Sequence, residues 1–202
     1  MYKAVVSDLD GTLLNEEHKV SPFTKETIEL LLKKGIKFYI ATGRGYVGAK
    51  EIMDEIGLKI PLITSNGARI VDENGAEIYV NNIEQKYVDK IFSINYKSFD
   101  KGIILNGFSG NHWYVTEDAR DYFYTQKPNR KQYPEQIEWK EFKKLAFTKI
   151  FFLGEHEKLL EIEKEIRKVT NGEVNIVFVN KKSLEIFSKD CDKAVAAGFL
   201  LL

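Results

Sequence analysis

The sequence predicts an α/β fold, a doubly wound parallel sheet into which an α+β domain is inserted. Short apolar runs rich in β-branched residues alternate with helical patterns as far as Thr64, which is the order of a parallel sheet with crossover helices. Two of these runs end directly in polar side chains, at Asp8 and at Thr42, where open α/β sheets bind ligands. After Val80 the strict alternation stops, which indicates the second domain.

The first strand begins after Lys3, and helix signals follow a short polar segment. Ser21 is a candidate N-cap, Pro22 suits the first helical position, and Gly35 marks the end of the helix. The other elements predicted here are a flap or tight turn at 13–20, a strand at 36–41, a helix at 45–56, a strand at 61–64, and a hairpin at 69–80 that turns at Asn74-Gly75.

The domain boundaries follow from the change of pattern. We assign residues 1–81 to the first part of the α/β core, 82–187 to an inserted α+β cap, and 188–202 to the return into the core. The elements predicted for the last two parts are helices at 85–96, 155–169 and 192–202, strands at 102–106, 112–115, 148–153, 174–179 and 183–187, a turn at 107–111, a short helix capped by Asp118, and a loop at 127–134.

Aromatic side chains are frequent in the predicted cap. They suit a substrate lid, although core packing is the favoured interpretation because large rings are usually buried. The residues concerned are Tyr87, Phe92, Tyr96, Trp113, Tyr122, Phe123 and Tyr124.

Composition excludes several classes of protein. Lys+Arg and Asp+Glu are both 30 in 202 residues, and this neutral balance disfavours a nucleic-acid partner. The single cysteine, Cys191, excludes an internal disulfide framework and fits a reducing compartment. The sequence contains no apolar segment of signal or membrane-spanning length, so we expect a cytoplasmic protein without a membrane partner.

Asp8 and Asp10 are the first candidates for chemistry. Side chains alternate along a strand, so these two carboxylates point to the same face. Carboxylates this close repel each other unless a cation or a shared proton lies between them. Magnesium suits an all-oxygen site, and it takes phosphate oxygens beside one or two carboxylates. The pair therefore suggests phosphoryl chemistry, the alternative being an acidic strand end that merely begins a turn.

Asp8-Leu9-Asp10-Gly11-Thr12, placed after an apolar strand, resembles the first signature of the haloacid dehalogenase-like (HAD) hydrolase superfamily. The resemblance implies a Rossmann-like core in which Asp8 is the nucleophile and Asp10 the general acid/base. It also implies a Mg²⁺ ion held by Asp8 and by the main-chain carbonyl of Asp10.

Thr42 resembles the second signature of the superfamily, a hydroxyl residue after an apolar strand that holds phosphate oxygens. By itself it also fits an ordinary helix N-cap. Thr42-Gly43-Arg44 and Ser65-Asn66-Gly67-Ala68 together are similar to the Cof-type branch, whose α+β cap enters after the third strand. That resemblance implies that Thr42, Gly43, Arg44 and Asn66 face the substrate or shape the phosphate pocket. Taken alone, Arg44 and Asn66 are residue types that more often serve surface or turn positions.

Leu184-Glu185-Ile186, followed by Lys193, resembles the return from the cap and the third signature. This implies that Lys193 neutralises the nucleophile and the transferring phosphoryl group. Lys189 competes for that role, and a solvated helix lysine is the plain alternative. The family usually has a glycine on either side of this lysine, whereas this chain has Asp190-Cys191-Asp192 before it and Ala194 after it.

The fourth signature, a Gly-Asp followed by a second acidic residue, has no match after Lys193. We therefore expect a core that is incomplete at its C-terminal side and a first strand with an exposed apolar edge.

These observations together predict a magnesium-dependent phosphatase. It would hydrolyse a small phosphorylated metabolite, such as a sugar phosphate, through an aspartyl-phosphate on Asp8. Two alternatives remain open at this stage. One is a phosphomutase of the same architecture, and the other is a catalytically incomplete fragment that binds phosphate or a partner.

Overall fold

The computed structural model describes residues 2–116, 122–123 and 133–201, and the chain divides into two compact units. The core unit comprises Met1–Val80 and Cys191–Leu202, and the inserted unit comprises Asn81–Asp190. Two of the predicted features, the helix capped by Asp118 and residues 127–132 of the predicted loop, lie outside the described residues.

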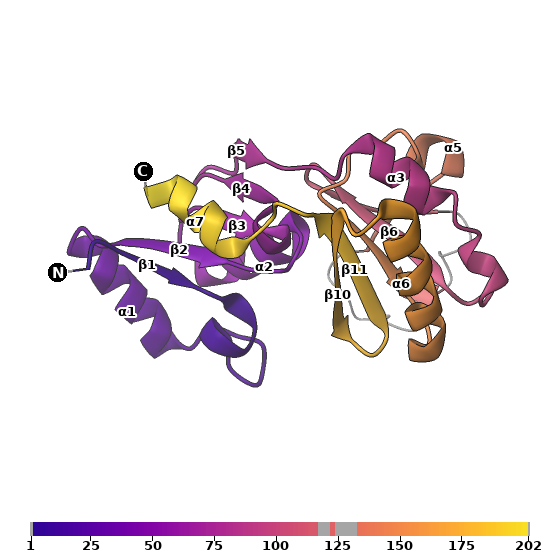
Figure 1. Ribbon diagram of the computed structural model, residues 1–202. Helices are drawn as coiled ribbons and strands as arrows, with labels where there is room; N and C mark the ends of the chain where they lie inside the picture. The colour runs from indigo at the N-terminus through magenta and orange to yellow at the C-terminus, as the bar shows by residue number, and fades with distance from the viewer. Residues whose placement is uncertain (1, 117–121, 124–132, 202) are drawn as a thin grey trace. The chain divides into compact units, whose positions relative to one another are not determined.

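The core unit is built on a sheet with the strand order β1-β2-β3-β4-β5 (Figure 1). Strands β1 to β3 run parallel, and the hairpin of β4 and β5 continues the sheet in antiparallel pairing. This pairing confirms the predicted change from crossover strands to a hairpin. The strands are β1 (Ala4–Ser7), β2 (Lys37–Ala41), β3 (Leu62–Thr64), β4 (Arg69–Val71) and β5 (Glu77–Val80).

Helices cover both faces of this sheet. Helices α1 (Pro22–Lys33) and α2 (Tyr46–Ile56) pack against one face, which includes Phe38 and Ile40 of β2. Helix α7 (Lys193–Leu201) packs against the other face, where Ala41 is the β2 contact. Alternate residues of β2 thus point to opposite helical layers, because side-chain direction reverses at each strand residue. The core unit is therefore doubly wound, as predicted.

Local signals in the sequence account for the ends of α1 and α2. The hydroxyl of Ser21 accepts a hydrogen bond from the amide of Thr24 and caps α1, with Pro22 in the first turn. Helix α2 ends at Gly57, whose left-handed backbone (φ 70°) suits the residue after a helix.

The parallel arrangement brings three segments to one edge of the sheet. Asp8 directly follows β1, Thr42 follows β2, and the turn Ser65–Gly67 follows β3. Strand β1 lies at the end of the described sheet, and Val6 on it is 39% exposed, which agrees with the predicted apolar edge. The chemistry-bearing residues of the sequence thus gather at the carboxyl ends of β1, β2 and β3.

The inserted unit is built on a second sheet. Its strand order is β10-β11-β9-β6-β7-β8, antiparallel except for the β7 and β8 pair. Helices α3 and α6 pack against the sheet through a core that contains Phe142, Phe147 and Phe152. The elements are α3 (Gln85–Phe92), β6 (Ile104–Ser109), β7 (His112–Thr116), β8 (Glu135–Ile137), α5 (Trp139–Phe142), β9 (Lys149–Leu153), α6 (His156–Thr170), β10 (Val174–Asn180) and β11 (Ser183–Ser188).

Two local predictions for the inserted unit are wrong, and two short elements were not predicted. Helix α3 ends at Phe92, and the hydroxyl of Ser93 donates a hydrogen bond to the carbonyl of Lys90 at this end. Strand β6 runs through Gly107, expected in a turn, because the ring of Phe147 occupies the place where a side chain would lie. The short elements β8 and α5 have no periodic pattern in the sequence and were not expected.

The aromatic residues of this unit pack in its interior. Tyr87, Phe92 and Tyr96 are partly buried and pack against the main core cluster. Trp113 and Phe123 are buried in a second cluster, against which the partly buried Tyr122 packs. Tyr124 lies outside the described residues. Core packing, the favoured interpretation, is confirmed for the described rings.

Candidate active site

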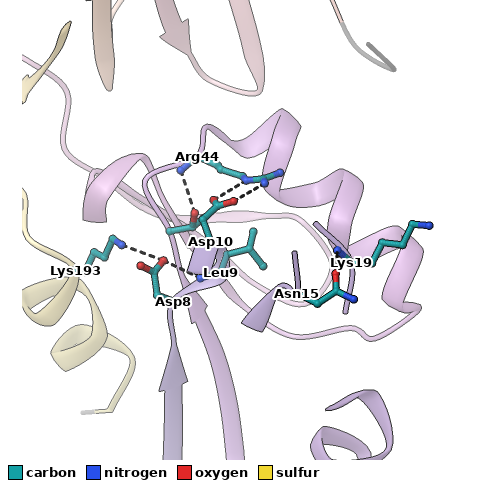
Figure 2. A network of polar contacts seen from close by, with 8 residues as sticks. Asp8, Leu9, Asp10, Asn15, Lys19, Arg44 and Lys193 are labelled. Carbon is teal, nitrogen blue, oxygen red and sulfur yellow. Dashed lines mark hydrogen bonds and ion pairs between the residues drawn. The ribbon is translucent and has the colours of Figure 1, made fainter. Parts of the chain in front are cut away.

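Asp8 lies where β1 gives way to a helical turn at Leu9–Leu13. Its Oδ1 accepts a hydrogen bond of 2.7 Å from the amide of Leu9 and lies 3.1 Å from Nζ of Lys193 (Figure 2). Among the described residues, none donates to its other oxygen, Oδ2. The carboxylate is therefore held at Oδ1, and Oδ2 is left open for another contact.

Asp10 faces a different cation. Nε and Nη2 of Arg44 donate to its two carboxylate oxygens at 2.8 and 2.6 Å, in a fork-to-fork arrangement (Figure 2). The hydrogen bonds from Arg44 hold the pKa of Asp10 below its usual value, and Asp10 in turn raises the pKa of Arg44. Asp8 and Asp10, which lie just after β1 and in the turn that follows it, thus each have a separate basic partner.

Thr42 is buried at the end of β2 and forms the start of the loop that carries Arg44. Its amide donates to the carbonyl of Ile63, and its hydroxyl accepts a hydrogen bond of 3.1 Å from the amide of Arg44. The carbonyl of Arg44 accepts from the amide of Ser65 at 2.8 Å. The backbone on either side of the Arg44 side chain is therefore fixed by the strands β2 and β3.

The turn after β3 packs directly on this loop. Asn66 has a left-handed backbone (φ 60°), and its amide donates to the carbonyl of Thr42. Its side-chain oxygen lies 2.8 Å from the position that a Cβ at Gly43 would take. Gly43 thus makes room for the side chain of Asn66, which places both residues beside Thr42.

Lys193 is the first residue of α7, and Asp192 sets its position. The carboxylate of Asp192 accepts hydrogen bonds from the amides of Ala194 and Val195 and caps the helix. This acidic cap stands where a glycine was expected, and Lys193 nevertheless reaches Asp8. The competing lysine, Lys189, pairs with Glu173 at 2.9 Å in the inserted unit.

Sequence reasoning missed the part played by Asp192 and Gly67. The signal for Asp192 was available, because an aspartate before an apolar helical run is a common N-cap. Gly67 has a left-handed backbone (φ 97°), and a Cβ there would overlap the carbonyl of Asp192. Only a glycine allows the turn after β3 to lie against the start of α7, so this contact brings Lys193 toward Asp8.

We expect Gly67→Ala to lower the free energy of unfolding of the core unit by about 3 kcal/mol, because it adds a left-handed alanine and a clash with the Asp192 backbone. Urea denaturation measures the change. Gly35→Ala is the matched control, because Gly35 also has a positive φ of 74° but nothing within 4 Å of its added Cβ. We expect the control to cost about 1 kcal/mol. Equal losses in the two variants would contradict the close approach at Gly67.

Comparison with known proteins decides which family this site belongs to. Residues 5–201 match the family model described as haloacid dehalogenase-like hydrolase. The chain belongs to this family. A protein from Buchnera aphidicola subsp. Baizongia pistaciae named "Putative phosphatase" is 40% identical over 196 residues, which cover 96% of this chain and 72% of that protein. An HMP-PP phosphatase from Yersinia pseudotuberculosis is 26% identical over 196 residues, covering 97% of this chain and 70% of that protein.

A solved haloacid dehalogenase-like hydrolase from Bacteroides thetaiotaomicron superposes with a TM-score of 0.80 at 22% identity, over 100% of this chain and 76% of that one. At this identity the likeness shows the fold. The family and the enzyme class predicted from the sequence, a HAD-like phosphoric monoester hydrolase, are therefore confirmed. Among the described residues, none of the helices has both the length and the apolar character that crossing a bilayer requires.

HAD hydrolases generally use Mg²⁺, an ion that binds oxygen donors. Within the described ranges, no group of three or more His, Cys, Asp or Glu side chains is placed to hold a metal ion. The Asp8 carboxylate fits a magnesium ion that keeps several waters and takes phosphate oxygens. The side chain of Asp10 is committed to Arg44, so a contribution from this residue would come through its main-chain carbonyl.

Proposed function

We propose that this HAD hydrolase cleaves a small phosphorylated metabolite, such as a sugar phosphate, through an aspartyl-phosphate on Asp8. The observation that carries the proposal is the state of the Asp8 carboxylate. Lys193 and the Leu9 amide hold one oxygen at 3.1 and 2.7 Å, while Oδ2 has no described donor. A carboxylate fixed at one oxygen and open at the other suits in-line attack on phosphorus.

In the first half-reaction, Oδ2 of Asp8 forms a bond to phosphorus while the bond from phosphorus to the leaving oxygen breaks. The leaving oxygen takes a proton from the carboxyl group of Asp10, which has to enter this step protonated although its hydrogen bonds with Arg44 lower its pKa. In the second half-reaction, the oxygen of a water molecule forms a bond to phosphorus while the bond from phosphorus to Oδ2 of Asp8 breaks. Asp10 accepts the proton that the water loses, so phosphate is released and the Asp8 carboxylate is restored. Lys193 offsets the negative charge that Asp8 and the phosphoryl group share.

Thr42, Gly43 and Asn66 are proposed to border the transferred phosphoryl group, because they lie together at the carboxyl ends of β2 and β3. Arg44, which the resemblance assigns to the same pocket, has two donors of its guanidinium on Asp10. Magnesium held by Asp8 and by the main-chain carbonyl of Asp10 would supply positive charge for the phosphoryl oxygens.

The test is phosphate release by the 202-residue chain, with and without Mg²⁺ and with EDTA. We expect release from an aryl phosphate or from members of a panel of sugar phosphates, and its loss in EDTA. HMP-PP belongs in the panel, because one relative is named for it. Conversion of a hexose phosphate into an isomer without net phosphate release would favour a phosphomutase. Absence of turnover on the whole panel would overturn the proposal.

A further inference from the structure

The two carboxylates of the site are held in unlike ways. Asp8 uses one oxygen for Lys193 and for the Leu9 amide, whereas Asp10 uses both oxygens for Arg44 (Figure 2). A single contact to a flexible ammonium fixes a distance, but two parallel bonds from a planar guanidinium also fix the orientation of the carboxylate plane. The structure therefore constrains the orientation of Asp10 more tightly than that of Asp8.

Arg44 is itself rigidly mounted. Its amide donates to the hydroxyl of Thr42 at 3.1 Å and its carbonyl accepts from Ser65 at 2.8 Å, so the backbone is tied to the ends of two adjacent strands. The next residue, Gly45, leads directly into α2. The backbone of Arg44 is thus fixed by the sheet, and its guanidinium contacts both oxygens of Asp10. Through these contacts Arg44 can restrict the movement of a carboxylate that lies in a turn.

The turn that carries Asp10 has an irregular backbone, although the proposed function requires the Asp10 carboxylate to transfer protons. Within Leu9–Leu13, Asp10 has an extended backbone (φ −77°, ψ 126°) and Gly11 a left-handed one (φ 72°). The side chain of Asp10 is 47% exposed, so close packing does not restrict its rotamers. Among the described residues, Arg44 makes the only ion pair recorded for Asp10.

We propose that Arg44 is a positioning residue for Asp10, holding the carboxylate in the orientation from which it reaches the leaving oxygen, and that it does not serve mainly as a phosphate ligand. The inference rests on the proposed function, because it assigns Arg44 a part in the acid/base step of that reaction. A positioning residue affects kcat only while Asp10 is present, whereas a phosphate ligand affects it whether or not Asp10 is present. The two roles can therefore be separated.

The experiment is a double-mutant cycle of Arg44→Gln and Asp10→Asn with Mg²⁺ and an alkyl phosphate, whose leaving oxygen needs a proton. We expect Asp10→Asn to lower kcat on the order of 10²-fold. Arg44→Gln should lower kcat about 30-fold in the wild-type background but less than about threefold in the Asp10→Asn background, because a positioning residue has no effect once its target is lost. Equal losses in both backgrounds would overturn the proposal.

Leaving-group dependence separates positioning from a general structural defect. On 2,4-dinitrophenyl phosphate, whose leaving group departs without a proton, Arg44→Gln should lower kcat less than about threefold. Arg44→Lys retains the charge but not the fork, so it should not restore kcat on the alkyl phosphate, whereas a phosphate-binding role would be largely restored. Arg167→Gln removes an arginine that pairs with Glu163 on α6 and should leave every rate unchanged.

Failure of the proposed function gives a different result. If Asp10→Asn leaves kcat on the alkyl phosphate unchanged, Asp10 is not the acid and both assignments fail. If no variant turns over, the same cycle is measured on the dissociation constant of inorganic phosphate. If the dissociation constants of Asp10→Asn and of the double variant agree within threefold, positioning is supported. If the double variant binds inorganic phosphate at least tenfold more weakly than Asp10→Asn does, Arg44 binds phosphate directly.

Discussion

Asp8→Asn is expected to lower kcat for phosphate release on the order of 10⁴-fold, the largest effect of any single change in the chain. The asparagine oxygen can still accept the hydrogen bond that the Leu9 amide gives to Asp8. An amide is a far weaker nucleophile than a carboxylate, and it leaves Lys193 without its anionic partner. Steady-state release of phosphate with Mg²⁺ measures the loss, and circular dichroism with thermal unfolding checks that the variant is folded.

Asp54→Asn is the matched control, because it makes the same chemical change at an exposed ion pair with Lys50 on α2. We expect its kcat to equal that of the unaltered chain. Rapid quenching of the unaltered enzyme with a labelled substrate should also trap a phosphoryl group on Asp8. Retention of more than a tenth of the activity in Asp8→Asn would mean that another group, or water, attacks phosphorus.

Lys193→Met should lower kcat on the order of 10³-fold, because the methionine fills similar space but supplies no positive charge beside Asp8. The variant would then lack this side chain's charge against the repulsion between the Asp8 carboxylate and the incoming phosphoryl group. The measurement is kcat and KM for the same substrate over a range of Mg²⁺ concentrations.

Lys189→Met tests the alternative that the sequence left open, in which Lys189 rather than Lys193 neutralises the nucleophile. Lys189 is only four residues earlier but pairs with Glu173, so its loss should change kcat less than about twofold. If Lys189→Met lost activity and Lys193→Met did not, the assignment of the two lysines would be reversed. Similar large losses in both would indicate damage to the segment that returns to the core unit.

Strands β1 to β3 and helices α1 and α2 could be predicted because their information is local. The signals for these elements are apolar periodicity, the Ser21 cap and the glycine at position 57. Each of them can be recognised from residues within or next to the element itself. The inserted unit was harder, because its short elements depend on neighbours distant in sequence. Gly107 lies in strand β6 because Phe147 occupies the space beside it, and no local pattern reports that contact.

The sequence by itself determined which groups are the candidates for the chemistry. Asp8, Asp10, Thr42 and Lys193 were named from strand ends and from a resemblance whose family is now confirmed. The sequence could not say how these charges pair, because ion pairing depends on side chains that meet across the carboxyl ends of the parallel strands. Only the tertiary structure decided that Arg44 contacts Asp10, and that Gly67 lets the turn after β3 approach Asp192 so that Lys193 contacts Asp8.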